Sequence, residues 1–418
     1  MSSPATASAF GEITRLAGDR RVHQAFRWLH LQERTVFGWQ VELVQVPAPP
    51  FGEEPRAEWL AGKFRELGLE DVGLDEAGNA IGILRGSRSG GSCVLLSAHI
   101  DTVFPAGTPI APIVDGERLA APGACDNGAG IAGMLAIASA LMDAGLQPGY
   151  DVVFAGNVGE EGDGNLRGIR HIYEHAPWRH EIKAHIVLDG AGENVAITQA
   201  LGSQRYRVTI TGPGGHSWTD AGAPNPILLL SQVITRLGAG ELPRSPRTTL
   251  NVGTIEGGTA INAIPERAVA SFDLRSTDPG QIIRLEVELH RAVEDAVMQA
   301  NHEMATRRPG NGAALSDRKN VDFTVEKIGE RPAGKLPEDS RLLDLLYAVD
   351  RQLGLRTEMR VASTDANIPL SLGVPAMALG AGGNGGGIHT RNEWYDATGR
   401  ELGLRRALLL LLGATGSV

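Results

Sequence analysis

Histidine and carboxylate residues stand in this chain where apolar runs end, and together they could bind metal ions. His99 closes the run CVLLSAH, Asp189 closes IVLD, and Glu161 comes shortly after DVVFAGNV. Asp126 follows a Pro-Gly turn in PGACDNGAG, and His389 ends GAGGNGGGIH. Imidazole and carboxylate ligands suit zinc, and two zinc ions that share a carboxylate form the type of centre used by hydrolases.

Two further carboxylates accompany these five residues. Asp101 lies two residues after His99, where it could hydrogen-bond the second nitrogen of a metal-bound imidazole. Glu160 immediately precedes Glu161. Because adjacent side chains point in different directions, one glutamate could bind metal while the other faces substrate and water as a general base.

Each residue also has an ordinary structural explanation. A histidine beside an acid is common on protein surfaces, and Asp126 could be the N-cap of the following helix. Glu160 and Glu161 could form a solvated acidic turn, and Asp189 and His389 are ambiguous in the same way. Only the whole set, at the ends of several apolar runs, favours a metal site.

The elements that position these residues predict an α/β fold, with a mixed, largely parallel sheet flanked by helices. Strands are expected over residues 93–100, 151–158 and 184–190, and helices over 22–46, 56–67 and 128–144. Open sheets of this kind bind ligands at the carboxyl ends of their strands. A final Leu-rich helix is expected after Gly399.

Between residues 201 and 333 the pattern changes to strand, helix, two strands, helix and strand. This order is that of a ferredoxin-like α+β domain. We therefore predict a catalytic domain made of residues 1–200 and 334–418, with the 201–333 domain inserted into it.

Composition excludes several classes of protein. The 418 residues are 42% hydrophobic and 21% charged, as in soluble globular proteins, and 54 are glycines that gather near the acidic and histidine residues. A net charge of -10 argues against nucleic acid or an anionic membrane as a partner. Two cysteines, Cys93 and Cys125, provide no disulfide framework. Without an apolar signal-peptide core or a membrane-length apolar run, the cytoplasm is the expected location.

The motifs, in their order, resemble those of a known enzyme family. SAHIDTV, GACDNGAG, GEEGDGNLRG, VLDG, GPGGHSW, GGTAINAIP and GIHT are similar to the motifs of zinc metallopeptidases that include tripeptidase T, carnosinase-type dipeptidases, carboxypeptidase G and acetylornithine deacetylase. The likeness covers nearly the whole chain. It implies a di-zinc exopeptidase-type fold with two zinc ions per subunit, although cobalt or manganese could use the same ligands.

The resemblance also implies how the ligands divide. His99 and Asp189 would hold one zinc ion, Glu161 and His389 would hold the other, and Asp126 would bridge the two.

Further roles follow from the same resemblance. Glu160 would be the general base, which takes a proton from the attacking water and returns it to the leaving amine, and Asp101 would orient His99. The family further implies a cis peptide bond between Asp126 and Asn127.

For the inserted domain, the resemblance implies a lid that also forms a homodimer. His216 would reach a neighbouring active site and stabilise the oxyanion, while Asn262 and Arg275 would hold a carboxylate or carbonyl of the substrate. Without the resemblance, GGHS would be a turn and Arg275 an exposed strand residue.

Substrate class is less constrained. Aspartate at position 189 is typical of family members that cleave dipeptides and tripeptides, and residues 363–380, with Asp365 and Asn367, resemble tripeptidase T-like proteins. The glycine-rich loop before His389 is longer than expected and could reshape the pocket, whereas Cys125 is most simply a small packing residue.

We therefore expect a zinc-dependent hydrolase that cleaves short peptides, most simply as an aminopeptidase. The alternative is an N-acyl-amino-acid deacylase or a carboxypeptidase G-like amidohydrolase. A non-catalytic binding protein on this fold would have lost ligands or the base, yet every such position is filled.

Overall fold

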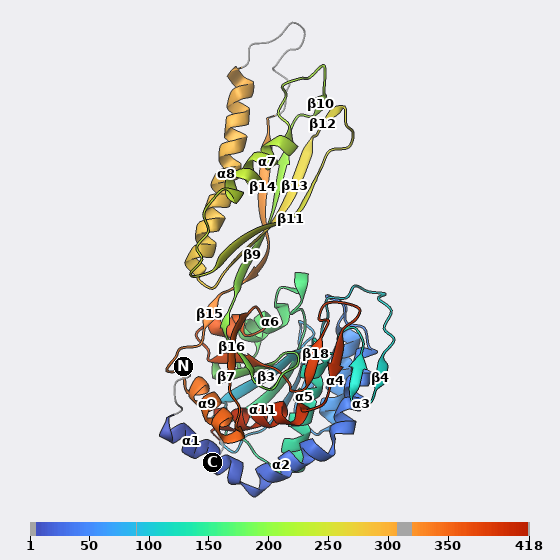
Figure 1. The fold of residues 1–418 in the computed structure, drawn as a ribbon, viewed down its shortest axis with the longest axis vertical. Helices are drawn as coiled ribbons and strands as arrows, with labels where there is room; N and C mark the ends of the chain where they lie inside the picture. The colour runs from blue at the N-terminus through green and yellow to red at the C-terminus, as the bar shows by residue number, and fades with distance from the viewer. Residues whose placement is uncertain (1–5, 89, 307–319, 417–418) are drawn as a thin grey trace. The chain divides into compact units, whose positions relative to one another are not determined.

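The computed structural model describes residues 6–88, 90–306 and 320–416. The chain forms two compact units, one of Met1–Ala200 with Gly334–Val418 and one of Leu201–Ala333. The first unit is discontinuous in sequence because the second is inserted into it (Figure 1). Within the described residues, no helix is long and apolar enough to cross a membrane.

A nine-stranded sheet forms the centre of the first unit. Its four middle strands, in spatial order, are parallel: β6 (Asp151–Asn157), β3 (Cys93–His99), β7 (Ile182–Leu188) and β17 (Ala376–Leu379). On either side the pairing becomes mixed, through β1 (Glu70–Leu74), β2 (Ala80–Leu84), β8 (Val195–Ala200), β15 (Gly334–Lys335) and β16 (Glu358–Ala362).

Strand β3 has apolar side chains on both of its faces, so both faces of the sheet are buried at this strand. All seven residues of β3 are buried. Alternate residues point to opposite faces, so Val94 and Leu96 join one apolar cluster while Cys93 and Leu95 join another. A continuous apolar run therefore forms a strand with two buried faces, as the sequence predicts.

Nine helices of the described part of the chain surround this sheet. Of these, α5 is made almost entirely of small and aliphatic residues and contacts β3 and β7, so it packs close to the strands. The helices are α1 (Ala7–Gly18), α2 (Arg20–Leu31), α3 (Glu33–Val44), α4 (Glu54–Glu66), α5 (Gly128–Asp143), α6 (Arg167–His175), α9 (Arg341–Leu353), α10 (Asn367–Ser371) and α11 (Arg400–Ala414).

A small antiparallel sheet beside the main one was not predicted. Its strands, in order, are β18 (Asn384–Gly386), β19 (Trp394–Asp396), β5 (Arg118–Ala120) and β4 (Ile113–Asp115). Part of the segment that the sequence predicts as a glycine-rich loop is therefore a strand. Each of these strands has only three residues, which is too short for a periodic signal.

The second unit has the predicted strand and helix order. Its sheet runs β11 (Thr248–Gly257), β13 (Arg267–Ser276), β9 (Gly202–Thr211) and β14 (Asp322–Arg331), all antiparallel. Helices α7 (Pro226–Gly238) and α8 (Pro279–Thr306) pack on each other and on β13 (Figure 1). A short ribbon joins β10 (Gly215–His216) to β12 (Ala263–Ile264).

These two folds confirm the predicted class, an α/β unit with a ferredoxin-like α+β insertion. One predicted helix is wrong in extent: residues 22–46 form α2 and α3, which separate at Gln32. Helix α1 was not predicted, although Ala9, Ile13 and Leu16 are buried along it at helical spacing.

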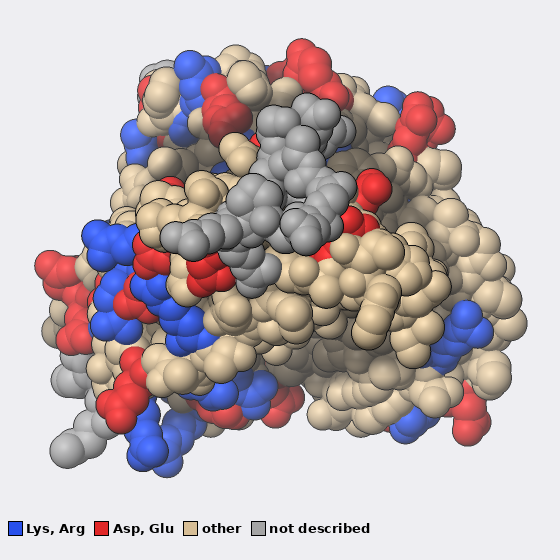
Figure 2. Space-filling view, turned by 90° about the horizontal axis from the view of Figure 1, so that it is seen from above, with Lys and Arg blue, Asp and Glu red and all other residues tan. Residues whose placement is uncertain are grey.

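Charges on one face of the structure are mixed in sign (Figure 2). On the face drawn in Figure 2, the described Lys and Arg side chains lie in small groups separated by acidic and uncharged residues.

Candidate metal centre

Three parallel strands deliver most of the candidate ligands to one edge of the sheet. His99 is the last residue of β3, and Glu160 and Glu161 follow the end of β6. Asp189 directly follows β7, whereas His389 comes three residues after β18 of the small antiparallel sheet. Because parallel strands end at the same edge, residues far apart in sequence meet there.

Asp126 lies between the two histidines. Its Oδ1 atom is 3.0 Å from Nε2 of His99, which is also 3.8 Å from Asp189 Oδ1. Its Oδ2 atom is 3.0 Å from Nε2 of His389, which is 2.9 Å from Glu161 Oε1. The two carboxylate oxygens of Asp126 therefore face two different sets of neighbours.

These contacts define groups that could hold metal ions. In each group, one ligand atom per residue lies within 4.8 Å of the others. Asp126 is common to two of the groups, which otherwise share no residue; a further group joins His99 to the glutamate pair. The groups are His99, Asp126 and Asp189; Asp126, Glu161 and His389; and His99, Glu160 and Glu161.

Asp101 is fully buried and holds the neighbouring segments together. Its carboxylate accepts the backbone N–H groups of Glu160, at 3.0 Å, and Glu161, at 2.8 Å. Nδ1 of His99 lies 3.1 Å from the backbone oxygen of Asp101 and 3.5 Å from its carboxylate. Asp101 therefore contacts the imidazole through its main chain and fixes the glutamate pair through its side chain.

Glu393 was not identified from the sequence, although it shapes the Asp126 turn. Its buried carboxylate accepts the backbone N–H groups of Gly123, Cys125 and Asp126, at 3.1, 2.8 and 2.7 Å. Burial raises the pKa of Glu393 to about 7. Since its partners are backbone groups some 270 positions away in the chain, no local motif marks this residue.

Asn127, rather than Asp126, caps helix α5. Its side-chain oxygen accepts the N–H of Gly130, at 3.0 Å, and the N–H of Gly190, at 3.1 Å. Its amide nitrogen donates to the backbone oxygen of Leu188, at 2.9 Å. The capping alternative for Asp126 is therefore wrong, which leaves its carboxylate directed at the histidines, and the Asp126–Asn127 peptide bond is cis, as the resemblance implies.

The electrostatics of the cluster reflect these close contacts. Burial alone would lower the pKa of His99, but hydrogen bonds to Asp101, Asp126 and Asp189 raise it well above its usual value. The hydrogen bond to Asp126 raises the pKa of His389 to about 9. Burial, followed by the charge of Asp126, raises the pKa of Glu161.

Asp365, which the sequence singles out as tripeptidase T-like, is fully buried behind this cluster. It accepts a hydrogen bond of 2.7 Å from the side chain of Asn157, the last residue of β6. Burial raises the pKa of Asp365 to about 7. It therefore supports the end of a ligand-bearing strand.

Cys125 packs against the glycine-rich segment before His389. A Cβ atom at Gly385 would collide with the Cys125 sulfur. Burial raises the pKa of the Cys125 thiol to about 12, so the side chain is a neutral packing group. The glycines of this segment permit close packing, as the sequence predicts.

The second unit contains His216, Asn262 and Arg275. His216 is in β10, and its neighbour Ser217 donates its N–H to the backbone oxygen of Asn262, at 3.0 Å, so these two residues lie on one ribbon. Arg275 is near the carboxyl end of β13, where its Nε donates a hydrogen bond of 2.6 Å to the carboxylate of Asp273.

That contact between Ser217 and Asn262 extends the pairing of β10 with β12. Arg275 pairs with Ser203 near the start of β9, whereas Gly212, just past the end of β9, bonds to Glu266. Within this unit, a length of roughly 25 Å of extended strand therefore separates Arg275 from the ribbon that carries His216 and Asn262.

The donor set fits divalent metal ions. Two imidazole nitrogens and several carboxylate oxygens converge, and the candidate ligands His99 and Glu161 are themselves buried. Nitrogen and oxygen donors of this kind suit zinc, cobalt or manganese rather than soft ions that need thiolates. Two ions that share Asp126 would satisfy both of its oxygens.

Comparisons with known proteins identify the family of this chain. The sequence profile of peptidase family M20/M25/M40 matches residues 95–411. The uncharacterized protein YqjE of Bacillus subtilis is 25% identical over 370 residues, which cover 84% of this chain and 91% of that protein. A succinyl-diaminopimelate desuccinylase of Methylobacterium sp. is 30% identical over 267 residues, covering 58% of this chain and 67% of that enzyme.

Solved structures share the fold. Aminopeptidase PepT from Bacillus cereus matches with a TM-score of 0.72 at 21% identity, covering 91% of this chain and 98% of that one. A tripeptidase from Staphylococcus aureus also matches with a TM-score of 0.72, at 23% identity, covering 92% of this chain and 99% of that one. The YXEP protein of Bacillus subtilis matches with a TM-score of 0.67 at 16% identity, covering 93% of this chain and 100% of that one. It is described as a dinuclear metal binding peptidase from the M20 family. Since the family profile spans most of the chain, this protein belongs to peptidase family M20/M25/M40 and is a metal-dependent hydrolase.

Proposed function

We propose that this protein is a two-zinc aminopeptidase that cleaves short peptides. The observation that carries the proposal is the position of Asp126, whose two oxygens face His99 on one side and His389 on the other. A carboxylate shared in this way is the arrangement that a pair of metal ions needs.

In this proposal, His99 and Asp189 would hold one zinc ion, Glu161 and His389 would hold the other, and Asp126 would be shared between them. When bound, such a pair of ions lowers the pKa of water and polarises a carbonyl group. The chain contributes rigidity, because Glu393 fixes the Asp126 turn through three backbone hydrogen bonds.

Glu160 is the proposed general base. It accepts a proton from the water that attacks the scissile carbonyl and returns that proton to the leaving amine. The Asp101 carboxylate accepts the backbone N–H of Glu160 at 3.0 Å, so the base stays beside Glu161.

Peptides are the favoured substrate class for two reasons. Aspartate rather than glutamate at position 189 is typical of relatives that act on di- and tripeptides. The aminopeptidase and the tripeptidase named above also share the fold over nearly their whole length.

The inserted unit has a proposed role as lid and dimer interface. His216 would stabilise the oxyanion in a neighbouring subunit, and Asn262 and Arg275 would bind the substrate. Sedimentation equilibrium measures whether the protein is a homodimer. A monomer with full activity would contradict the role of His216 across subunits.

A substrate panel tests the function. The zinc-loaded protein is assayed against matched dipeptides, tripeptides, N-acyl amino acids and C-terminal glutamate amides, and free tripeptides are expected to be hydrolysed fastest. The second candidate, an N-acyl-amino-acid deacylase, is favoured by the similarity to the desuccinylase. Faster hydrolysis of N-acyl amino acids would replace our proposal with this one.

A further inference from the structure

One cavity of the first unit adjoins segments that carry the candidate ligands. Its volume is about 580 Å³, which is within the range of small-molecule sites. Its lining includes Val103 and Pro105, shortly after Asp101, and Gly162 and Asp163, directly after Glu161. The chain connectivity therefore places this cavity next to the proposed reaction centre.

The wall of this cavity is mostly apolar. It includes Pro49, Pro50, Val103, Pro105 and Ala106. Proline has no backbone N–H, so the three prolines among these residues offer no main-chain donor. Such a wall suits an apolar group better than a polar one.

Phe51 completes the apolar wall in an unusual conformation. Its φ is 66°, in the left-handed region that non-glycine residues rarely adopt, and the residue is 68% exposed. The Arg167 guanidinium lies 5.2 Å from its ring centroid and is itself held by the buried Glu53, at 2.7 Å. An exposed aromatic side chain kept in a strained conformation often marks a binding site.

Hydrogen bonds fix this loop to the strand end that bears His99. Thr102 donates its N–H to the backbone oxygen of Ala48, at 2.9 Å. The buried Arg56 donates to the backbone oxygens of Val46 and Ile100, both at 2.8 Å. The position of the apolar wall is therefore coupled to that of the ligand-bearing strand.

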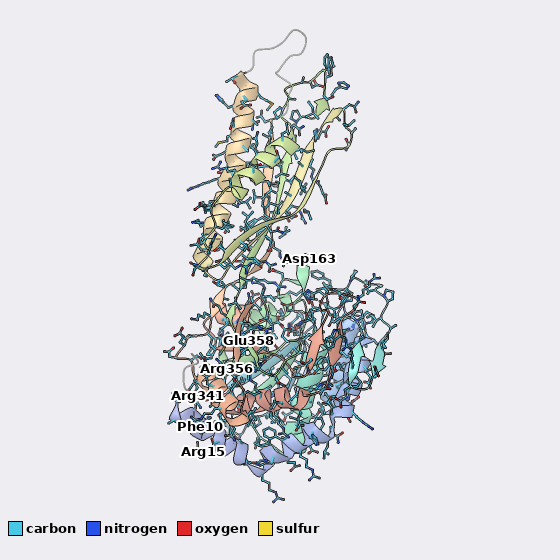
Figure 3. The ribbon with its side chains drawn as sticks, in the orientation of Figure 1. Phe10, Arg15, Asp163, Arg341, Arg356 and Glu358 are labelled. Carbon is cyan, nitrogen blue, oxygen red and sulfur yellow. The ribbon has the colours of Figure 1, made fainter. Side chains whose placement is uncertain are left out.

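Asp163 is the one carboxylate that lines this cavity. It lies in the short η1 segment (Gly162–Gly164) and is exposed (Figure 3). Within the described parts of the chain, no cationic side chain forms an ion pair with it. An apolar wall with a single free carboxylate matches a group that carries an apolar side chain and an ammonium.

We propose that this cavity binds the N-terminal residue of the substrate, with its apolar side chain against Phe51 and its free α-ammonium paired with Asp163. The inference rests on the proposed peptidase function and specifies it further. The favoured substrates are peptides that have a free amino terminus and a large apolar first residue.

Binding and turnover are measured separately to test this inference. Calorimetry gives the affinity of the zinc-loaded Glu160→Gln protein for Phe-Gly-Gly, Gly-Gly-Gly and N-acetyl-Phe-Gly-Gly. The same peptides are titrated into proteins that also carry Phe51→Ala or Asp163→Asn. Matched controls carry Leu31→Ala, at a site 60% exposed, or Asp339→Asn, at an exposed acidic site.

Phe-Gly-Gly is expected to bind roughly tenfold more tightly than either other peptide. Phe51→Ala should remove the preference over Gly-Gly-Gly alone, and Asp163→Asn should remove the preference over the acetylated peptide alone. The controls should retain both preferences. Should the alanine variant be unstable, Phe51→Gly suits the positive φ and gives the same test.

Two results separate this inference from the proposed function. Equal affinities for the three peptides, or preferences that survive both substitutions, overturn the inference even if the wild-type protein hydrolyses Phe-Gly-Gly. The expected preferences without any hydrolysis by the wild-type protein support the binding site and overturn the peptidase function.

Discussion

Glu160 is buried beside Glu161, and the Asp101 carboxylate accepts the backbone N–H groups of both residues. Because a general base contributes roughly 10²- to 10⁴-fold to a rate, Glu160→Gln should lower kcat by at least about 100-fold. Bound zinc should stay unchanged, since Glu160 is not one of the proposed ligands. Steady-state kinetics with metal analysis check this, and near-normal turnover would refute the role of Glu160.

Glu393 supports the Asp126 turn through three backbone N–H groups. Glu393→Ala leaves these buried donors without their acceptor, so it should lower the free energy of unfolding by roughly 3 kcal/mol. It should also weaken zinc binding by roughly tenfold or more, because the turn positions Asp126, the proposed bridging carboxylate. Urea unfolding and chelator competition measure both effects. Glu338→Ala, at an exposed site, is the control, and equal zinc affinity in the two variants would contradict the supporting role.

Among individual residues, the candidate metal ligands are easier to identify from the sequence than the residues that hold those ligands in position. His99 and Asp189 are recognisable because each closes an apolar run. Glu393 acts on backbone groups that only the folded chain brings near it, so it leaves no local pattern. Asn127 caps the N–H of Gly130 three residues on, which is a local pattern that asparagine favours, whereas its contact with the N–H of Gly190 depends on tertiary structure.

Strand β7 carries a buried histidine whose protonation is linked to folding. Burial lowers the pKa of His185 to about 3, from an ordinary value of 6.5, and its ring nitrogens contact Ser97, at 2.8 Å, and Tyr173, at 3.2 Å. Below pH 6.5 the unfolded chain binds a proton that the native protein excludes until about pH 3. The contribution of His185 to stability is therefore complete above pH 6.5 and is lost progressively as the pH falls toward 3.

Between about pH 7.5 and about pH 5, this linkage should cost the wild-type protein roughly 2 kcal/mol of unfolding free energy. Over the same pH interval, the unfolding free energy of the His185→Gln protein should fall by roughly 2 kcal/mol less than that of the wild-type protein. Urea unfolding at the two pH values measures the difference, with His180→Gln as a control at an exposed site. Equal losses in the wild-type and His185→Gln proteins would show that His185 is not the titrating group.

Strand β18 packs directly on Cys125. Gly385→Ala places a Cβ against the Cys125 sulfur and should destabilise the protein by about 1–3 kcal/mol. Adding Cys125→Ala removes the sulfur and should restore most of that loss. Thermal unfolding checks both variants. Gly73→Ala in β1, where nothing lies within 4 Å of the added Cβ, is the matched control. A double variant no more stable than Gly385→Ala would exclude this contact as the cause.

Elements with long, regular patterns could be predicted from the sequence, and short ones could not. The apolar run of β3 and the periodic apolar face of α8 determine their own structure. The break between α2 and α3 at Gln32 has no proline or glycine to mark it, and both helices pack on α5. The three-residue strands β4, β5, β18 and β19 depend on pairing between distant segments.

For the whole molecule, the two units have separate hydrophobic cores. The core of the inserted unit is built from β9, β13, α7 and α8. His216 and Asn262 belong to this unit, whereas every proposed ligand belongs to the other. Metal binding by the first unit can therefore be tested independently of the proposed lid and dimer roles.

The most direct test of the two-metal account is the rate of tripeptide hydrolysis as zinc is added to metal-free protein. We expect the rate to rise until about two equivalents of zinc per chain and then to remain constant, because Asp126 joins two ligand sets. A plateau at one equivalent, or no hydrolysis at any zinc concentration, would contradict the account.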